Sequence, residues 1–60
     1  MTTFDAVMTI EQPDEDTTED TIIEAWQHLI NSGVVWQLQG FYGRTAKTLI
    51  EQGICTMPSR

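Results

Sequence analysis

Cysteine is nearly absent from this chain of 60 residues, in which Cys55 is the only one. A single cysteine excludes an internal disulfide, and a lone thiol is typical of a reducing, cytoplasmic setting. A chain this short buries only about 60% of the surface that its unfolded form exposes, so its stability is marginal. We expect one small domain in which Cys55 packs as a small apolar residue near a helix end. The alternative for this thiol is an intermolecular disulfide or a reactive role.

Long apolar runs are missing as well. The chain has no stretch of about 18 apolar residues that would span a membrane. Residues 1–12 also lack the basic and apolar regions of a secretory signal. We therefore expect no membrane contact, and a protein that stays in the compartment where it is made.

Positive charge is scarce, with three Lys or Arg residues against nine Asp or Glu and a net charge of −6. Eight of the nine carboxylates lie in residues 1–24, where there is no Lys or Arg. Because nucleic-acid affinity depends on cations that release counterions from phosphates, we do not expect duplex DNA as a partner. The acidic charge either complements a basic protein surface or only keeps a small protein in solution.

Apolar residues at helical spacing predict an all-α mini-domain of three helices. In residues 3–12, Phe4, Val7 and Met8 follow the i, i+3, i+4 pattern and form the apolar face of a short helix. Residues 12–18 are rich in carboxylates, and Pro13 disfavours helical geometry at Gln12. We expect this stretch to be an acidic linker.

The clearest predicted helix covers residues 19–33. It begins after an N-cap at Thr18, or one turn later at a capping box formed by Thr21 and Glu24. Gly33 is the expected left-handed C-cap. Five apolar side chains repeat at helical spacing along one face. They are Ile22, Ile23, Trp26, Leu29 and Ile30.

Residues 34–39 are short and apolar, and fit either one helical turn or an extended segment. The last helix is expected over residues 41–52 and ends at Gly53, so it forms a helix-turn-helix hairpin with the preceding helix. Residues 56–60 are expected to be a loose tail. The apolar face of the last helix holds Tyr42, Ala46, Leu49 and Ile50.

Two glycines stand at the start of this last helix. Gly40 fits a turn that needs positive φ, whereas Gly43 lies where glycine costs about 1 kcal/mol relative to alanine. We expect Gly43 to allow close packing against Trp26 or Trp36. The alternative is an anion cradle, formed by backbone N–H groups of residues 40–43 and the guanidinium of Arg44.

Aromatic residues are dense for so small a chain. Two helices of this length can hardly enclose four large rings, so at least one ring is expected to be exposed. An exposed aromatic ring flanked by glutamines and an arginine has the composition of an interaction hot spot. The predicted partner-binding residues are therefore Trp36, Gln37, Gln39, Phe41, Tyr42 and Arg44.

The residue types that carry catalysis or metal binding are few. His28 and Glu24 are expected to form an exposed pair on one helix, and the only other strong metal ligand is Cys55. Nothing orients the one cysteine and the one histidine for nucleophilic catalysis. We expect no enzyme, no metal site and no cofactor.

The segment "AWQHLINSGVVWQLQGFYGRTAKTLIEQGIC", residues 25–55, resembles a family of very small, uncharacterised proteins from tailed bacteriophages. The shared pattern reads WQLQGxxGRxAxxLIxxG, preceded by a helix that ends in LIxxG. The resemblance implies a phage origin and a location in the host cytoplasm, and it implies no activity. The matching residues are Leu29, Ile30, Gly33, Trp36, Gln37, Leu38, Gln39, Gly40, Gly43, Arg44, Ala46, Leu49, Ile50 and Gly53.

Three functions follow from these features. The favoured one is an accessory protein that docks on a host or phage protein. The second is a self-associating structural protein whose oligomer buries the same aromatic side chains. The third is a small helix-turn-helix regulator whose last helix would present Arg44 and Lys47 to DNA, which Glu51 and the acidic net charge oppose.

Overall fold

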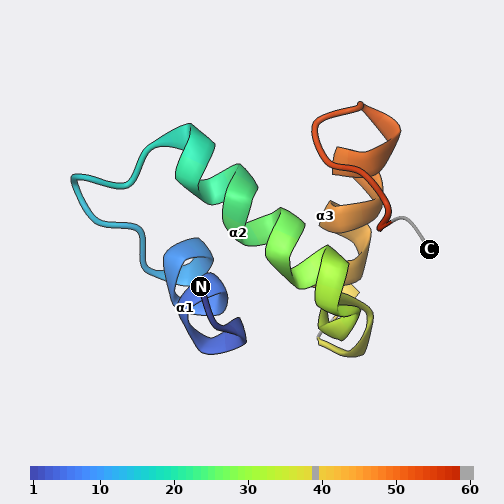
Figure 1. Ribbon diagram of the computed structural model, residues 1–60, viewed down its shortest axis with the longest axis horizontal. Coiled ribbons are helices and arrows are strands. Elements are labelled where there is room, and N and C mark those ends of the chain that lie inside the picture. Colours follow the sequence, from blue (N-terminus) through green and yellow to red (C-terminus); the bar gives the residue numbers. More distant parts are fainter. Residues whose placement is uncertain (39, 59–60) are drawn as a thin grey trace.

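The computed structural model describes residues 1–38 and 40–58, and the regular elements in this part of the chain are all helical. They are α1 (Thr3–Glu11), α2 (Glu19–Ser32), the 3-10 helix η1 (Val34–Gln37) and α3 (Gly40–Glu51). α2 runs across the molecule, α1 packs along one side of it, and α3 crosses near its C-terminal end (Figure 1). The predicted all-α fold of three helices is confirmed. Within the described ranges, every helix is too short or too polar to cross a membrane.

Threonine side chains fix where the first two helices begin. Thr2 Oγ1 accepts a hydrogen bond from the backbone N–H of Asp5 at 3.1 Å. Thr18 Oγ1 accepts one from the N–H of Thr21 at 3.2 Å, so α2 starts at the first of its two predicted caps. Gly33 ends α2 with φ 81°, the left-handed C-cap that the sequence predicted.

The acidic linker between α1 and α2 closes on itself in a turn. The Asp14 carboxylate accepts hydrogen bonds from the backbone N–H of Asp16 and the hydroxyl of Thr17, both at 2.9 Å. The Thr17 hydroxyl in turn accepts one from the Asp14 N–H at 3.0 Å. An aspartate that bonds to the backbone two residues later is a common way to hold a turn. The linker therefore has a defined shape and keeps its carboxylates exposed.

The inner face of α1 differs from the predicted one. Ala6 is fully buried, and Val7 and Ile10 pack against the core. Phe4 instead remains 71% exposed, so its predicted place on the packed face is wrong. The physical reason is the small side chain of Ala6, which turns toward the core and directs Phe4, about 160° away around the helix, to solvent.

Residues of α1, α2, η1, α3 and the segment after α3 all contribute to the core. η1 contacts both α2 and α3 and sends Val35 inward, so this short turn joins the two longer helices. Each α-helix also contributes one alanine of zero exposure, and a small side chain lets helices approach closely. The buried residues are Ala6, Ala25, Trp26, Leu29, Ile30, Val35, Tyr42, Ala46 and Cys55.

The segment after α3 returns along α2. Cys55 is 1% exposed, as the sequence predicted for a packed thiol, and burial raises the pKa of that thiol. Beyond it, Gln27 of α2 donates to the Thr56 carbonyl at 2.7 Å and accepts from the Thr56 N–H at 2.9 Å. The predicted loose tail over residues 56–60 is thus anchored at its first residue.

The glycines at the start of α3 have more room than the sequence suggested. Gly40 is the first residue of α3 and has no positive φ, so that explanation for it is wrong. Gly43 lies beside Trp36, one of its two predicted neighbours. A β-carbon at Gly43 would meet only Trp36 Cε3, at 3.8 Å, which is an ordinary van der Waals contact. Close packing therefore does not require a glycine at this position.

We accordingly expect Gly43→Ala to raise the free energy of unfolding by about 0.5–1 kcal/mol, through helix propensity and a less flexible unfolded chain. Urea unfolding followed by circular dichroism measures this change. Gly33→Ala is the matched control, because its φ of 81° is strained for any residue with a side chain, and it should lower stability. A loss of stability in Gly43→Ala would show that α3 needs closer contact with Trp36 than the structure gives.

Candidate functional site

The predicted partner-binding residues separate into exposed and buried groups. Trp36 and Phe41 are 46% and 52% exposed, and Gln37 and Arg44 are also on the surface. Tyr42 is only 5% exposed and belongs to the core, so its ring is not available to a partner. The remaining predicted residue, Gln39, lies outside the described residues.

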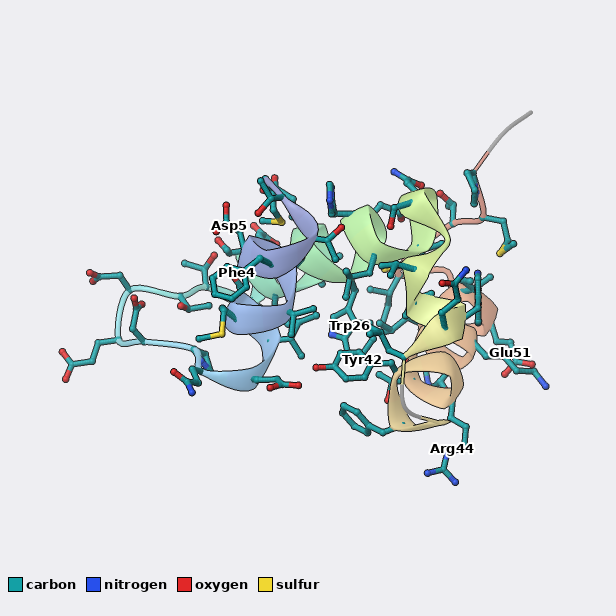
Figure 2. The ribbon with its side chains drawn as sticks, turned by 90° about the horizontal axis from the view of Figure 1, so that it is seen from below. Phe4, Asp5, Trp26, Tyr42, Arg44 and Glu51 are labelled. Atoms are coloured by element: carbon teal, nitrogen blue, oxygen red, sulfur yellow. The ribbon has the colours of Figure 1, made fainter. Side chains whose placement is uncertain are left out.

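The rings of Trp26, Phe41 and Tyr42 form one cluster at the first turn of α3. Trp26 and Tyr42 have ring centroids 5.5 Å apart, and both are buried (Figure 2). Phe41 packs edge-on against each of them, with centroid distances of 6.2 Å to Trp26 and 5.3 Å to Tyr42. Such edge-to-face pairs add stability beyond the area that they bury. The cluster therefore runs from the core to the surface, where it ends in the half-exposed ring of Phe41.

A hydrogen bond ties this cluster to α1. The Tyr42 hydroxyl donates to the Glu11 carboxylate at the last residue of α1, 31 positions earlier in the chain. Burial is the main cause that raises the pKa of Tyr42 from 10.0 to about 12, and the hydrogen bond and negative charge of Glu11 add to it. Sequence reasoning missed Glu11, because it pairs through tertiary contact and no local pattern marks it.

The titration of Tyr42 should be visible directly, because it is the only tyrosine in the chain. We expect its phenolate absorbance to appear near pH 12 in the folded protein. In the unfolded chain the pKa of Tyr42 is about 10. Because the folded protein holds the phenol proton more tightly, the protonated phenol stabilises the fold, and this stabilisation is complete below pH 10 and is lost as the pH rises toward 12.

Glu11→Gln is the control for this titration, since it removes the negative charge and leaves the burial. Its Tyr42 pKa should fall between 10 and the wild-type value. A wild-type tyrosine that titrates at its ordinary pKa, while circular dichroism still shows the folded domain, would contradict the buried Tyr42–Glu11 contact.

Trp36 and Phe41 lie on different sides of α3. The Trp36 ring packs beside Gly43, two residues after Phe41. Positions two apart on a helix do not share a face, whereas Arg44 is three residues from Phe41 and does. The exposed part of the predicted set therefore divides into a Trp36 side, with Gln37 next in the chain, and a Phe41–Arg44 side.

Two alternatives from the sequence, the anion cradle and the DNA-binding helix-turn-helix regulator, find little support in this geometry. Figure 2 shows the Arg44 side chain directed away from the molecule, and not folded back over the first turn of α3 as an anion cradle would need. α2 and α3 are joined through η1, which has the order of a helix-turn-helix unit. However, α3 exposes Glu51 as well as Arg44 and Lys47, and the carboxylate would repel a DNA backbone.

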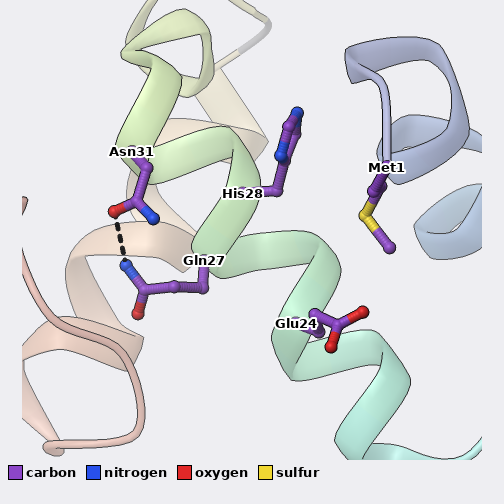
Figure 3. Close-up of a pocket in the computed structure, with 5 residues that line it drawn as sticks. All are labelled: Met1, Glu24, Gln27, His28 and Asn31. Carbon is purple, nitrogen blue, oxygen red and sulfur yellow. Dashed lines mark hydrogen bonds between the residues drawn. The ribbon is translucent and has the colours of Figure 1, made fainter.

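An open hollow of about 310 Å³ lies between the N-terminus and α2 (Figure 3). Glu24 and His28 line it one helical turn apart, and Met1 closes one side. Gln27 is already bonded to Asn31 at 3.0 Å and to Thr56. Among the described residues, no three His, Cys, Asp or Glu side chains come together to hold a metal ion. The four polar side chains of the hollow all come from α2, and only Glu24 and His28 among them are of the types that commonly bind metal ions.

These features define a small all-α domain with a buried aromatic cluster that reaches the surface at one end of α3. The chain belongs to a family described as a domain of unknown function, DUF7417, whose profile matches residues 3–60. That match includes α1 and the acidic linker as well as residues 25–55, so all three helices are part of the family domain. No curated protein and no solved structure matches the chain.

Proposed function

We propose that this chain is a small phage-encoded accessory protein that binds a host or phage protein in the host cytoplasm and has no catalytic role. The resemblance of residues 25–55 to small proteins of tailed phages supports the phage origin. The observation that supports binding is the half-exposed ring of Phe41, which continues the buried Trp26–Tyr42 pair to the surface beside Arg44.

This arrangement has the properties of a contact hot spot. Phe41 is held by two buried rings, so a partner that covers it would restrict little additional side-chain motion. Arg44 stands one turn along the same face and can donate several hydrogen bonds at the rim. Aromatic rings and arginines are the side chains that most often dominate interface energetics. Trp36 and Gln37 form a second exposed group on the other side of α3.

The proposal is tested by retention of host proteins on the tagged chain. The wild type is compared with Phe41→Ser/Arg44→Glu, and circular dichroism confirms that both are folded. Lys47→Glu is the control, because it makes the same charge change as Arg44→Glu at another exposed position of α3. We expect a protein that the wild type and the control retain and the double variant loses. Equal retention by all three would overturn the proposal for this surface.

Self-association is the second candidate, because a second copy would also cover half-exposed rings. Light scattering at micromolar concentration distinguishes the two. A wild-type mass above that of the monomer, which returns to the monomer in the Phe41→Ser/Arg44→Glu variant, would establish the self-associating function in place of the docking function.

A further inference from the structure

α1 carries two apolar stripes, and the fold uses only one of them. Ala6 and Ile10, four residues apart, face the core. Phe4 and Met8 are also four residues apart and therefore neighbours on the helix surface, and they form a separate stripe. Met8 is half-buried, and Phe4 has the highest exposure, 71%, of the large apolar side chains in the described part of the chain.

The outer stripe lies about 160° around α1 from the buried Ala6, and its Phe4 is mostly exposed. Figure 2 shows Phe4 and Asp5 on the side of α1 away from Trp26 and Tyr42. An alanine or a polar residue at position 4 would serve the inner packing equally well, because Phe4 makes no part of the core. An exposed aromatic ring beside a second apolar side chain is the composition of a contact surface.

The charged side chains of α1 and the acidic linker are all carboxylates. All eight carboxylates of residues 1–24 are exposed, and the first side chain that can carry positive charge is His28. Asp5 is next to Phe4 in the first turn of α1, and the carboxylates of the linker follow α1 directly. A helix of nine residues is about 13 Å long, which exceeds one Debye length of about 8–10 Å, so Asp5 acts at the Phe4 end of the stripe and the linker carboxylates act mainly at its Met8 end.

We propose that the outer face of α1, defined by Phe4, Met8 and Asp5, docks a cationic amphipathic segment of a partner protein. An apolar side chain of that segment covers Phe4 and Met8, and its Lys or Arg side chains meet Asp5 and the acidic linker. This surface is distinct from the one at Phe41 and Arg44, so it does not depend on the function proposed above.

The charges favour this occupant over two others. A second copy that docked α1 against α1 would bring two acidic surfaces together, and like charges oppose contact. A second copy that offered α3 would bring Arg44 and Lys47, but Glu51 lies one turn from Lys47 and offsets it. A nucleic acid would bring phosphates against carboxylates. A segment rich in Lys or Arg fits both the apolar stripe and its charged surroundings.

The test is calorimetric titration of the full chain with a short synthetic amphipathic helix of lysine and leucine, beside the same helix with glutamate in place of lysine. We expect the lysine helix to bind and the glutamate helix not to bind. Phe4→Ser should weaken binding by about tenfold or more, through the apolar contact it removes. Asp5→Asn should weaken it less, and added salt should reduce the difference from wild type.

Two variants elsewhere serve as matched controls. Ile54→Ser removes an exposed apolar side chain after α3, and Glu51→Gln removes an exposed carboxylate from α3. Both should bind the lysine helix as the wild type does. Binding that is absent, or that Phe4→Ser and Ile54→Ser weaken equally, would overturn the proposal. So would a wild-type dimer that Phe4→Ser dissociates, because a second copy would then be the occupant.

Discussion

Trp26→Ala is expected to leave the chain largely unfolded at room temperature. Trp26 is 5% exposed and contacts both other rings of the aromatic cluster. Truncation of a buried tryptophan to alanine costs about 3–5 kcal/mol. A core in a chain this short supplies about 3–5 kcal/mol of net stability, so the loss is comparable to the whole. Far-ultraviolet circular dichroism and urea unfolding of the variant measure the effect.

The second tryptophan provides the control for this experiment. Trp36 is 46% exposed, so Trp36→Ala should keep the fold and lower the free energy of unfolding by about 1 kcal/mol or less. Each variant also retains a single tryptophan. Fluorescence from Trp26 alone should be typical of a buried indole and should shift to longer wavelength on unfolding. A Trp26→Ala protein with the melting temperature of the wild type would show that the aromatic cluster is not the centre of the core.

α2 was predictable because its local signals agree with its surroundings. Thr18 and Gly33 mark its ends through backbone geometry that depends on neighbouring residues alone. Its apolar residues form one broad stripe along the helix, so only one face of α2 can pack against the core. The structure therefore buries Trp26, Leu29 and Ile30, as the spacing predicts.

α1 shows where such a prediction fails. Nine residues with apolar side chains on two faces allow two ways to pack, and spacing alone does not choose between them. Packing on α2 chooses the face with Ala6, since a small side chain permits closer approach than Phe4 would. Which face of α1 is buried therefore depends on how α1 and α2 pack together, and the sequence of α1 alone does not predict it.

The candidate site was predictable in composition and not in arrangement. Counting rings indicated that at least one would be exposed but not which one. In the structure α2 buries Trp26, whereas η1 buries Val35 and leaves Trp36 46% exposed. Tyr42 and Phe41 are adjacent in sequence, and one is core while the other is surface. The bond from Tyr42 to Glu11 spans 31 positions, which no local pattern encodes.

The close approach of the helices leads to the second large effect, which is expected for Ala25→Leu. Ala25 has zero exposure on α2, as Ala6 has on α1 and Ala46 on α3. A leucine adds three carbon atoms where the surrounding atoms already enclose a methyl group. Overpacking of this kind costs about 1–3 kcal/mol, through displaced helices or strained side chains. Leucine has nearly the helix propensity of alanine, so helix propensity does not account for the loss.

Glu24→Leu is the matched control, since it places the same side chain at the adjacent, exposed position of α2. It should change the free energy of unfolding by about 0.5 kcal/mol or less. Urea unfolding of the two variants beside the wild type gives both values. If Ala25→Leu is as stable as Glu24→Leu, the space around Ala25 accepts a larger side chain. Tight packing would then not be the reason for an alanine at position 25.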